Sequence, residues 1–174
     1  MVRILIGGFA LALTACAPTV AGSGPVATPA VIAPAERAVI QSAIDGVYAV
    51  ISGPPGAPRD WAKMRTLFTP DARLVAITRN GLRGGGVDDF IRDSGPGITK
   101  SGFVERELSN RMEVYGGLAH VWSSYSGTSG DGKIHVRGIN SFQLHRQADG
   151  RWKVFTIYWQ AENPALPLPA DMTR

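Results

Sequence analysis

The sequence predicts one α+β domain whose strands form an antiparallel sheet, and two observations support this prediction. The two segments with helical periodicity precede most of the strand-like segments and do not alternate with them, which is typical of α+β folds. The last four strand-like segments are joined by short turns rich in glycine. They should therefore form consecutive hairpins and run antiparallel.

The first predicted helix, residues 34–52, carries its apolar side chains on one face. They are Val39, Ile40, Ala43, Ile44, Val47, Tyr48 and Ile51. Pro34 suits the first turn of a helix, and the glycines and prolines at 53–56 end it. A second, shorter helix is predicted at residues 58–68, where Trp61 and Phe68 belong to an apolar stripe.

The predicted strands alternate in polarity and are separated by turn residues. A strand at residues 72–78 is followed by a loop with three consecutive glycines, residues 79–86, a one- or two-turn helix at 87–93 and a loop at 94–99. The last four strands are expected at residues 103–115, 118–128, 133–146 and 151–161. Residues 164–174 contain three prolines and are predicted to form a tail outside the fold.

The first fifteen residues have the layout of an export signal. Arg3 precedes an uncharged apolar stretch that is too short to cross a bilayer, which takes about 20 residues. Leu13-Thr14-Ala15-Cys16 is similar to the lipobox of bacterial lipoproteins, in which the chain is cut before a cysteine that becomes lipid-modified. Ordinary cleavage after Ala17 also fits and would leave a soluble periplasmic or secreted protein. We favour lipidation at Cys16 and anchoring to a membrane of the cell envelope, because this only cysteine stands where the lipobox requires it.

The remainder divides into a tether and a domain. Residues 16–33 have neither a charged nor an aromatic side chain and are predicted to form a flexible tether, whereas residues 34–163 suffice for one domain with its own core. The net charge of +4 is small and its basic residues are scattered, so nucleic acid is not an expected partner.

Several short runs resemble the nuclear transport factor 2-like superfamily, in its SnoaL-like branch. Residues 60–74 look like its second helix passing into its first strand, residues 137–142 look like its penultimate strand, and residues 150–154 look like its final hairpin. The resemblance covers residues 34–162. It implies a bent sheet wrapped around the N-terminal helices as a cone-shaped roll with a pocket at its open end. It also implies that homodimers through the outer sheet face are common, and that activities range from isomerases, cyclases and hydrolases to proteins without chemistry.

The candidate binding residues are polar or aromatic side chains that could reach such a pocket. His120, Trp122 and Ser124 share one strand face, and would form a polar and aromatic wall if that face looks into the cone. Arg137 and Asn140 point to opposite faces, so at most one of them meets the pocket directly. The complete set of candidates is Tyr48, Trp61, His120, Trp122, Arg137, Asn140 and Tyr158.

No catalytic residue is assigned from the sequence. Glu105 and Glu107 share a strand face and could be paired carboxylates, but an exposed edge face is the favoured interpretation. The three histidines lack the spacing of metal ligands, and the loop at 79–86 lacks the lysine of a phosphate-binding loop. Neither a metal nor a cofactor is therefore expected.

Three hypotheses follow for function. The first is a lipid-anchored domain that binds a small, partly apolar molecule without catalysis. The second is an isomerase, cyclase or hydrolase that uses His120 or a glutamate together with Tyr158. The third is an assembly module of the cell envelope, whose cone is filled by its own aromatic side chains. A wide cone with buried polar groups favours the enzyme, a wide apolar cone favours binding, and a filled cone favours assembly.

Overall fold

The computed structural model describes residues 31–173, so the predicted signal, Cys16 and nearly all of the predicted tether lie outside the described residues. Three α-helices and six strands make up the domain, with a short 3₁₀ helix near the C-terminus. In chain order they are α1 (Pro34–Ile51), α2 (Trp61–Leu67), β1 (Phe68–Thr78), β2 (Gly81–Gly85), α3 (Val87–Ser101), β3 (Phe103–Tyr115), β4 (Leu118–Ser129), β5 (His135–Arg146), β6 (Trp152–Ala161) and η1 (Ala170–Met172). No helix within residues 31–173 is long and apolar enough to cross a membrane.

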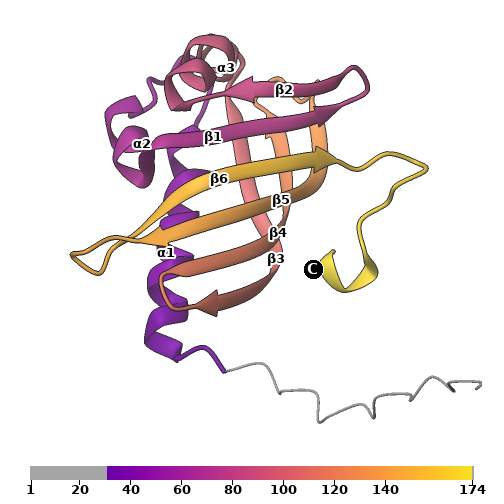
Figure 1. Ribbon diagram of the computed structural model, residues 1–174. Coiled ribbons are helices and arrows are strands. Elements are labelled where there is room, and N and C mark those ends of the chain that lie inside the picture. The colour runs from indigo at the N-terminus through magenta and orange to yellow at the C-terminus, as the bar shows by residue number, and fades with distance from the viewer. Residues whose placement is uncertain (1–30, 174) are drawn as a thin grey trace, which may run out of the picture. The chain divides into compact units, whose positions relative to one another are not determined.

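The predicted α+β class and the bent sheet are confirmed. The six strands lie in the order β2-β1-β6-β5-β4-β3, and they curl around α1, which lies on the concave side (Figure 1). All neighbouring pairs are antiparallel except β1 and β6, which are parallel. The exception arises because β6 enters the sheet between β5 and the much earlier β1. The hairpin between β5 and β6 makes these two strands antiparallel, but it does not determine the direction of β6 relative to β1.

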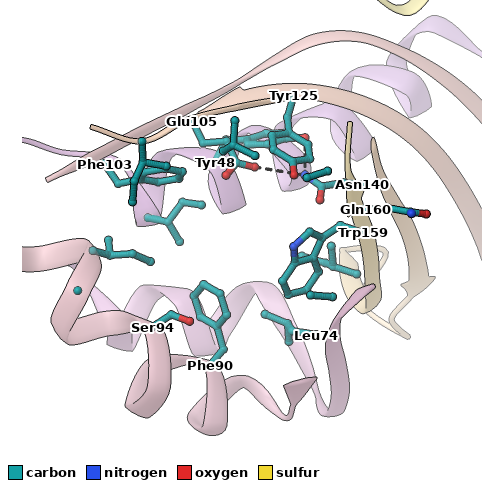
Figure 2. Close-up of a pocket in the computed structure, with 18 of the residues that line it drawn as sticks. Tyr48, Leu74, Phe90, Ser94, Phe103, Glu105, Tyr125, Asn140, Trp159 and Gln160 are labelled. Atoms are coloured by element: carbon teal, nitrogen blue, oxygen red, sulfur yellow. Dashed lines mark hydrogen bonds between the residues drawn. The ribbon is translucent and has the colours of Figure 1, made fainter. Parts of the chain in front are cut away.

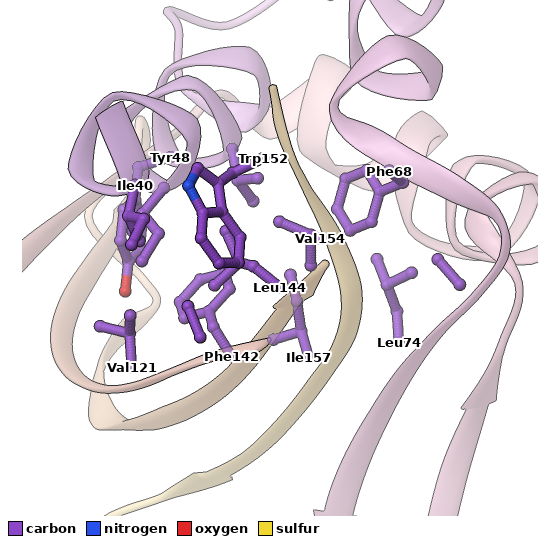
Figure 3. Packing of buried hydrophobic residues seen from close by; sticks show 14 of the residues in the cluster. Ile40, Tyr48, Phe68, Leu74, Val121, Phe142, Leu144, Trp152, Val154 and Ile157 are labelled. Carbon is purple, nitrogen blue, oxygen red and sulfur yellow. The ribbon is translucent and has the colours of Figure 1, made fainter. Parts of the chain in front are cut away.

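The core lies between α1 and the concave face of the sheet. Ile40 and Ile44 of α1 are fully buried, as the helical periodicity predicts, and they belong to the same cluster as Val121 and Phe142 from β4 and β5. Figure 3 shows Ile40 and Tyr48 facing these strand residues across the interior. Burying each such aliphatic side chain stabilises the fold by about 1.5–3 kcal/mol.

Arg59 holds the end of α1 against the loop that follows it. Its guanidinium is buried and donates to the carbonyl oxygens of Ile51 (3.1 Å) and Gly53 (2.7 Å). The Ile51 carbonyl has no partner within the helix, because the last turn of an α-helix leaves its acceptors free, and the Gly53 carbonyl also accepts from the Phe103 N–H (3.0 Å). A buried side chain with several donors therefore replaces the usual glycine cap.

Two segments that the sequence places in loops are regular structure. Residues 81–85 form the edge strand β2, paired with β1, and α3 continues through the predicted loop at 94–99. Gly95 and Pro96, in the predicted loop, are poor helix formers. However, Gly95 lets the helix approach Trp61, whose ring lies 3.2 Å from the position that a Cβ would take. Tertiary packing thus outweighs the local preference.

The segment after β6 packs on the domain, which corrects the prediction of a tail outside the fold. Met172 is only 1% exposed, Leu168 is also buried, and Asp171 pairs with Arg111 of β3. Figure 1 shows this segment turning back beside β3 and β4. The prolines prevent regular structure there, but they do not prevent apolar side chains from being buried.

Candidate functional site

A cavity of about 950 Å³ opens between the concave face of the sheet, α1 and α3. Its wall is mostly apolar and includes Leu74, Phe90, Ile98, Phe103, Val136, Phe142, Ile157 and Trp159. Figure 2 shows Phe90 projecting into this space from below and Trp159 from the right, with the polar side chains above. A cavity of this size suits a small organic molecule, and it excludes the filled cone that the assembly hypothesis requires.

Four polar side chains meet at one end of the cavity. They are Tyr48 of α1, Glu105 of β3, Tyr125 of β4 and Asn140 of β5. The Asn140 Nδ2 donates to the Tyr48 hydroxyl (3.1 Å) and to Glu105 Oε1 (3.3 Å). The cavity therefore combines apolar walls with a small polar cluster contributed by four different elements.

A bulge in β3 determines which of its side chains face inward. Phe103, Glu105 and Glu107 face the interior before the register shift at 107–109, and Met112 faces it afterwards. The shift inserts one residue, so the inward positions change from odd to even numbers. As a result, the carboxyl group of Glu105 lines the cavity, whereas that of Glu107 lies outside the cavity lining and bonds to Gln41 of α1.

The environment of Glu105 makes its carboxyl group suited to proton transfer near neutral pH. Removal from water by burial among apolar groups raises its pKa from 4.5 to about 7, although the hydrogen bond from Asn140 opposes the rise. Burial disfavours the charged form of a carboxyl group, and this effect dominates here. Near pH 7 the group exists in both forms, as a general acid or base requires.

Both tyrosines of the cluster keep their protons. Burial, with a further contribution from the charge of Glu105, raises the pKa of Tyr48 and of Tyr125 well above the usual value. The Tyr125 hydroxyl lies over Gly138, 2.7 Å from the position that a Cβ would take there. Only glycine at this position leaves room for that hydroxyl. Tyr125 can therefore donate a hydrogen bond into the cavity.

Two of the predicted binding residues line the cavity. Tyr48 and Asn140 are brought together there, and Asn140 points inward while Arg137 points outward, as their spacing predicts. Arg137 instead forms an ion pair with Glu162 (3.3 Å). Trp61 does not line the cavity either, since its ring packs against Gly95 of α3.

The remaining candidates lie on the outer face of the sheet, which corrects the expectation that they face the cone. Trp122 and Tyr158 are each 38% exposed, and His120 bonds to Ser141 (3.1 Å) beside Trp122. Side chains alternate along a strand, and the positions facing inward on β4 are Ala119, Val121, Ser123 and Tyr125. Alternation groups His120 with Trp122 and Ser124, but it does not say which group faces the core.

Glu105 and Tyr125 line the cavity but are not among the predicted binding residues. The sequence contains a pattern that places Glu105 on the inner face. Glu105 shares a strand face with the apolar Phe103, and the later apolar residues of the strand fall at even numbers, which indicates a bulge between them. The expectation of an exposed edge face is wrong here. Although β3 is the edge strand, α1 covers its inner face, and Gln41 of α1 donates to Glu107 (2.7 Å).

Comparisons with known proteins identify the fold. No family sequence model matches the chain, and no curated protein matches it by sequence. Solved structures do match. A protein of unknown function with a cystatin-like fold from Nostoc punctiforme PCC 73102 aligns with a TM-score of 0.60 at 11% identity, covering 79% of this chain and 98% of that one. A nuclear transport factor 2-like superfamily protein from Salmonella enterica aligns with a TM-score of 0.59 at 14% identity, covering 74% and 92%. The fold is nuclear transport factor 2-like.

Proteins with this nuclear transport factor 2-like fold include enzymes. The hexachlorocyclohexane dehydrochlorinase LinA-type3 from Novosphingobium barchaimii LL02 aligns with a TM-score of 0.59 at 16% identity, covering 74% of this chain and 88% of that one. Other matching structures are described as a candidate ketosteroid isomerase and a candidate dehydratase. At these identities the likeness concerns the fold alone, so function has to be argued from the cavity.

Proposed function

We propose that the domain is an acid–base enzyme that binds a small, partly apolar molecule in the cavity and transfers a proton at a carbon atom. Glu105 is the base in this proposal. The observation that carries it is a carboxyl group with a pKa of about 7 at the polar end of an apolar cavity. Perturbed carboxyl groups in concave sites are characteristic of acid–base enzymes.

The proposed step uses groups that already face the cavity. The ionised Glu105 takes a proton from a carbon next to a carbonyl group, and the electron pair of the broken C–H bond moves toward the carbonyl oxygen. The Tyr125 hydroxyl, which keeps its proton, donates a hydrogen bond to the negative charge that develops on that oxygen. Glu105 then returns the proton to a second carbon or protonates a departing hydroxyl group, giving an isomerisation or a loss of water.

The names of structural relatives fit this class of chemistry. A dehydrochlorinase removes hydrogen chloride, and a dehydratase removes water. Each of these eliminations removes a proton from the carbon next to the one that loses chloride or hydroxide. Glu105 supplies the proton acceptor that such a step needs, at the polar end of the apolar cavity.

Proton exchange provides a test that does not depend on knowing the substrate. A panel of cyclic ketones in D₂O is incubated with the domain, and deuterium uptake at the carbon next to the carbonyl is followed by NMR. We expect catalysed uptake whose rate rises with pH through an apparent pKa of about 7, and which Glu105→Gln abolishes. Glu113→Gln, the same change at an exposed position of β3, is the matched control and should leave the rate unchanged.

A second candidate function is binding without catalysis, which the largely apolar wall favours. It predicts that ketones bind in the cavity and that no exchange depends on Glu105. The same panel therefore separates the two functions.

We also propose that the mature protein is anchored to a membrane through a lipid on Cys16. The proposal is supported by the lipobox-like run at residues 13–16 and by the absence of any other cysteine in the sequence. Mass spectrometry of the mature N-terminus should find acylated Cys16 as the first residue. An unmodified Pro18 in first position would overturn the anchor and leave export intact.

A further inference from the structure

A chain of hydrogen bonds connects the cavity with Glu107, a partly buried carboxylate that does not line it. Ser123 Oγ donates to Glu107 Oε1 (2.5 Å), and the Tyr48 hydroxyl lies 2.8 Å from Ser123 Oγ. Asn140 Nδ2 donates to the Tyr48 hydroxyl oxygen (3.1 Å), which completes the chain to the cavity. Ser123 is fully buried, and Tyr48 and Asn140 are almost so, so water cannot replace these partners.

The acceptors at the outer end of the chain determine its direction. Glu107 Oε2 accepts from Gln41 (2.7 Å) and from Asn110 (2.9 Å), while its Oε1 accepts from Ser123. The amide of Gln41 cannot be reversed at low cost, because its nitrogen also donates to Asp45 (2.9 Å). Glu107 is thus surrounded by donors and serves only as an acceptor.

Each hydroxyl group then has one possible role. Ser123 has a single proton, which it gives to Glu107, so its oxygen must accept the proton of Tyr48. The oxygen of Tyr48 is left to accept, and only the nitrogen of the Asn140 amide can donate to it. Glu107, three hydrogen bonds away, therefore orients the Asn140 amide, and Glu105 reinforces this orientation by accepting from the same nitrogen.

This orientation exposes one particular atom to the cavity. The Asn140 nitrogen uses its two hydrogens on Tyr48 and Glu105, and the amide oxygen points into the cavity (Figure 2). No described residue donates a hydrogen bond to that oxygen. The neighbouring carboxyl group of Glu105 offers a further acceptor when it is ionised. Asn140 and ionised Glu105 therefore present acceptors to the cavity, beside the Tyr125 hydroxyl, which is a donor.

We infer that Glu107 is a positioning residue that selects ligands carrying a hydrogen-bond donor. By fixing the direction of the chain through Ser123, Tyr48 and Asn140, it makes the cavity complementary to a molecule with an apolar body and a hydroxyl or N–H group. The inference rests on the proposed function only in taking the cavity as the ligand site. It adds the class of ligand and the residue that determines it.

The expected selectivity follows from the cost of an unpaired acceptor. A ligand of the same shape without a donor displaces water from the Asn140 oxygen and gives it no hydrogen bond. Such a ligand should bind about tenfold or more weakly than one with a donor. A site that merely buries apolar surface would bind both ligands alike.

Three bicyclic probes of similar shape test this selectivity by equilibrium dialysis. They are 2-naphthol, which has a donor, 2-fluoronaphthalene, which has none, and 2-naphthaldehyde, which has only an acceptor. We expect the unchanged domain to bind 2-naphthol about tenfold more tightly than 2-fluoronaphthalene. In Glu107→Gln, the new amide can donate to Ser123, so the chain can reverse. The Asn140 amide can turn with it while Glu105 is protonated and donates to the amide oxygen. The preference for 2-naphthol should then fall below about threefold, and 2-naphthaldehyde should bind more tightly than before.

Two further variants secure the interpretation. Glu113→Gln makes the same change at an exposed position of the same strand and should preserve the preference. Ser123→Ala removes the middle of the chain, so it should reduce the preference even if Glu107→Gln does not fold. Equal binding of 2-naphthol and 2-fluoronaphthalene, no binding of any probe, or a preference that survives both Glu107→Gln and Ser123→Ala would overturn the inference. The proposed enzymatic function is tested separately by deuterium exchange into ketones. It fails if that exchange does not depend on Glu105.

Discussion

Replacing Glu105 with glutamine should stabilise the protein at neutral and alkaline pH while it abolishes the proposed activity. Glutamine keeps the shape of the side chain, and its oxygen can still accept from Asn140 as Glu105 Oε1 does (3.3 Å). It removes only the ability to carry a negative charge. The variant therefore isolates the electrostatic cost of keeping this carboxyl group in the cavity.

The pKa of Glu105 determines the size of this effect. Burial raises the pKa from 4.5 to about 7. One pKa unit corresponds to about 1.4 kcal/mol, so ionised Glu105 lowers the free energy of unfolding by about 3 kcal/mol. Because water can enter the cavity and partly solvate the carboxylate, this figure is an upper value.

The direction of the pH dependence follows from the same values. Below pH 4.5 the group is protonated in both the folded and the unfolded chain, and it contributes no difference. Between pH 4.5 and about 7 the unfolded chain loses this proton while the folded chain keeps it, so stability falls as the pH rises. Above about pH 7 the loss is complete and constant. Glu105→Gln should therefore match the unchanged domain at pH 4 and exceed its stability by up to about 3 kcal/mol at pH 8.

Urea unfolding at pH 4, 6 and 8, followed by circular dichroism, measures this difference. All other titrating groups are shared by the two proteins, so their contributions cancel in the comparison. Glu113→Gln is the matched control and should change stability by less than about 0.5 kcal/mol at each pH, since its side chain is exposed. An equal effect of Glu105→Gln at pH 4 and pH 8, or a destabilisation that grows with pH, would refute the reasoning.

Three further predictions concern other parts of the molecule. Tyr48→Phe should lower the free energy of unfolding by about 2 kcal/mol, measured with urea, because Ser123 and Asn140 each lose a buried partner; no loss would contradict the hydrogen-bond chain. Arg59→Met should lower the free energy of unfolding by about 3 kcal/mol, because the carbonyl groups of Ile51 and Ala57 lose the hydrogen bonds from the guanidinium, whereas the same change at an exposed arginine should have little effect. A homodimer through the outer sheet face would bury Trp122, so Trp122→Glu should convert it to a monomer in size-exclusion chromatography with light scattering; a monomeric unchanged domain would refute this interface.

The reduced stability expected from Glu105 agrees with its proposed role. A purely structural side chain at this position would be apolar or permanently neutral, because burying a carboxyl group among apolar residues lowers stability. Sites that combine such a cost with an accessible cavity are characteristic of function. The stability and exchange measurements therefore both test the raised pKa of the Glu105 carboxyl group.

Much of the fold could be predicted from local patterns. The spacing of Ile40, Ile44 and Val47 correctly predicts most of the buried face of α1, since a helix repeats every 3.6 residues and a core accepts one face, but Val39 at the edge of that face is 51% exposed. Turn residues between strands locate the hairpins of β3 to β6. The prediction of a loop at residues 94–99 is wrong, because Gly95 and Pro96 are poor helix formers and the packing of Gly95 against Trp61 cannot be predicted from local sequence.

The site was only partly predictable. The alternation of a strand assigns Asn140 and Arg137 to opposite faces, and the sequence alone determines this. It also places Glu105 with Phe103, and it contains the single cysteine that the anchor proposal uses. Each of these facts depends on residues that are neighbours along the chain.

The tertiary structure alone decided which face of each strand looks inward. The curl of the sheet around α1 sends His120, Trp122 and Tyr158 outward and brings Tyr48, Glu105, Tyr125 and Asn140 together from four elements. The raised pKa of Glu105 and the direction of the chain from Glu107 depend on burial by distant residues. Local sequence specifies periodicity, whereas desolvation and hydrogen-bond direction arise only when segments far apart in the chain exclude water together.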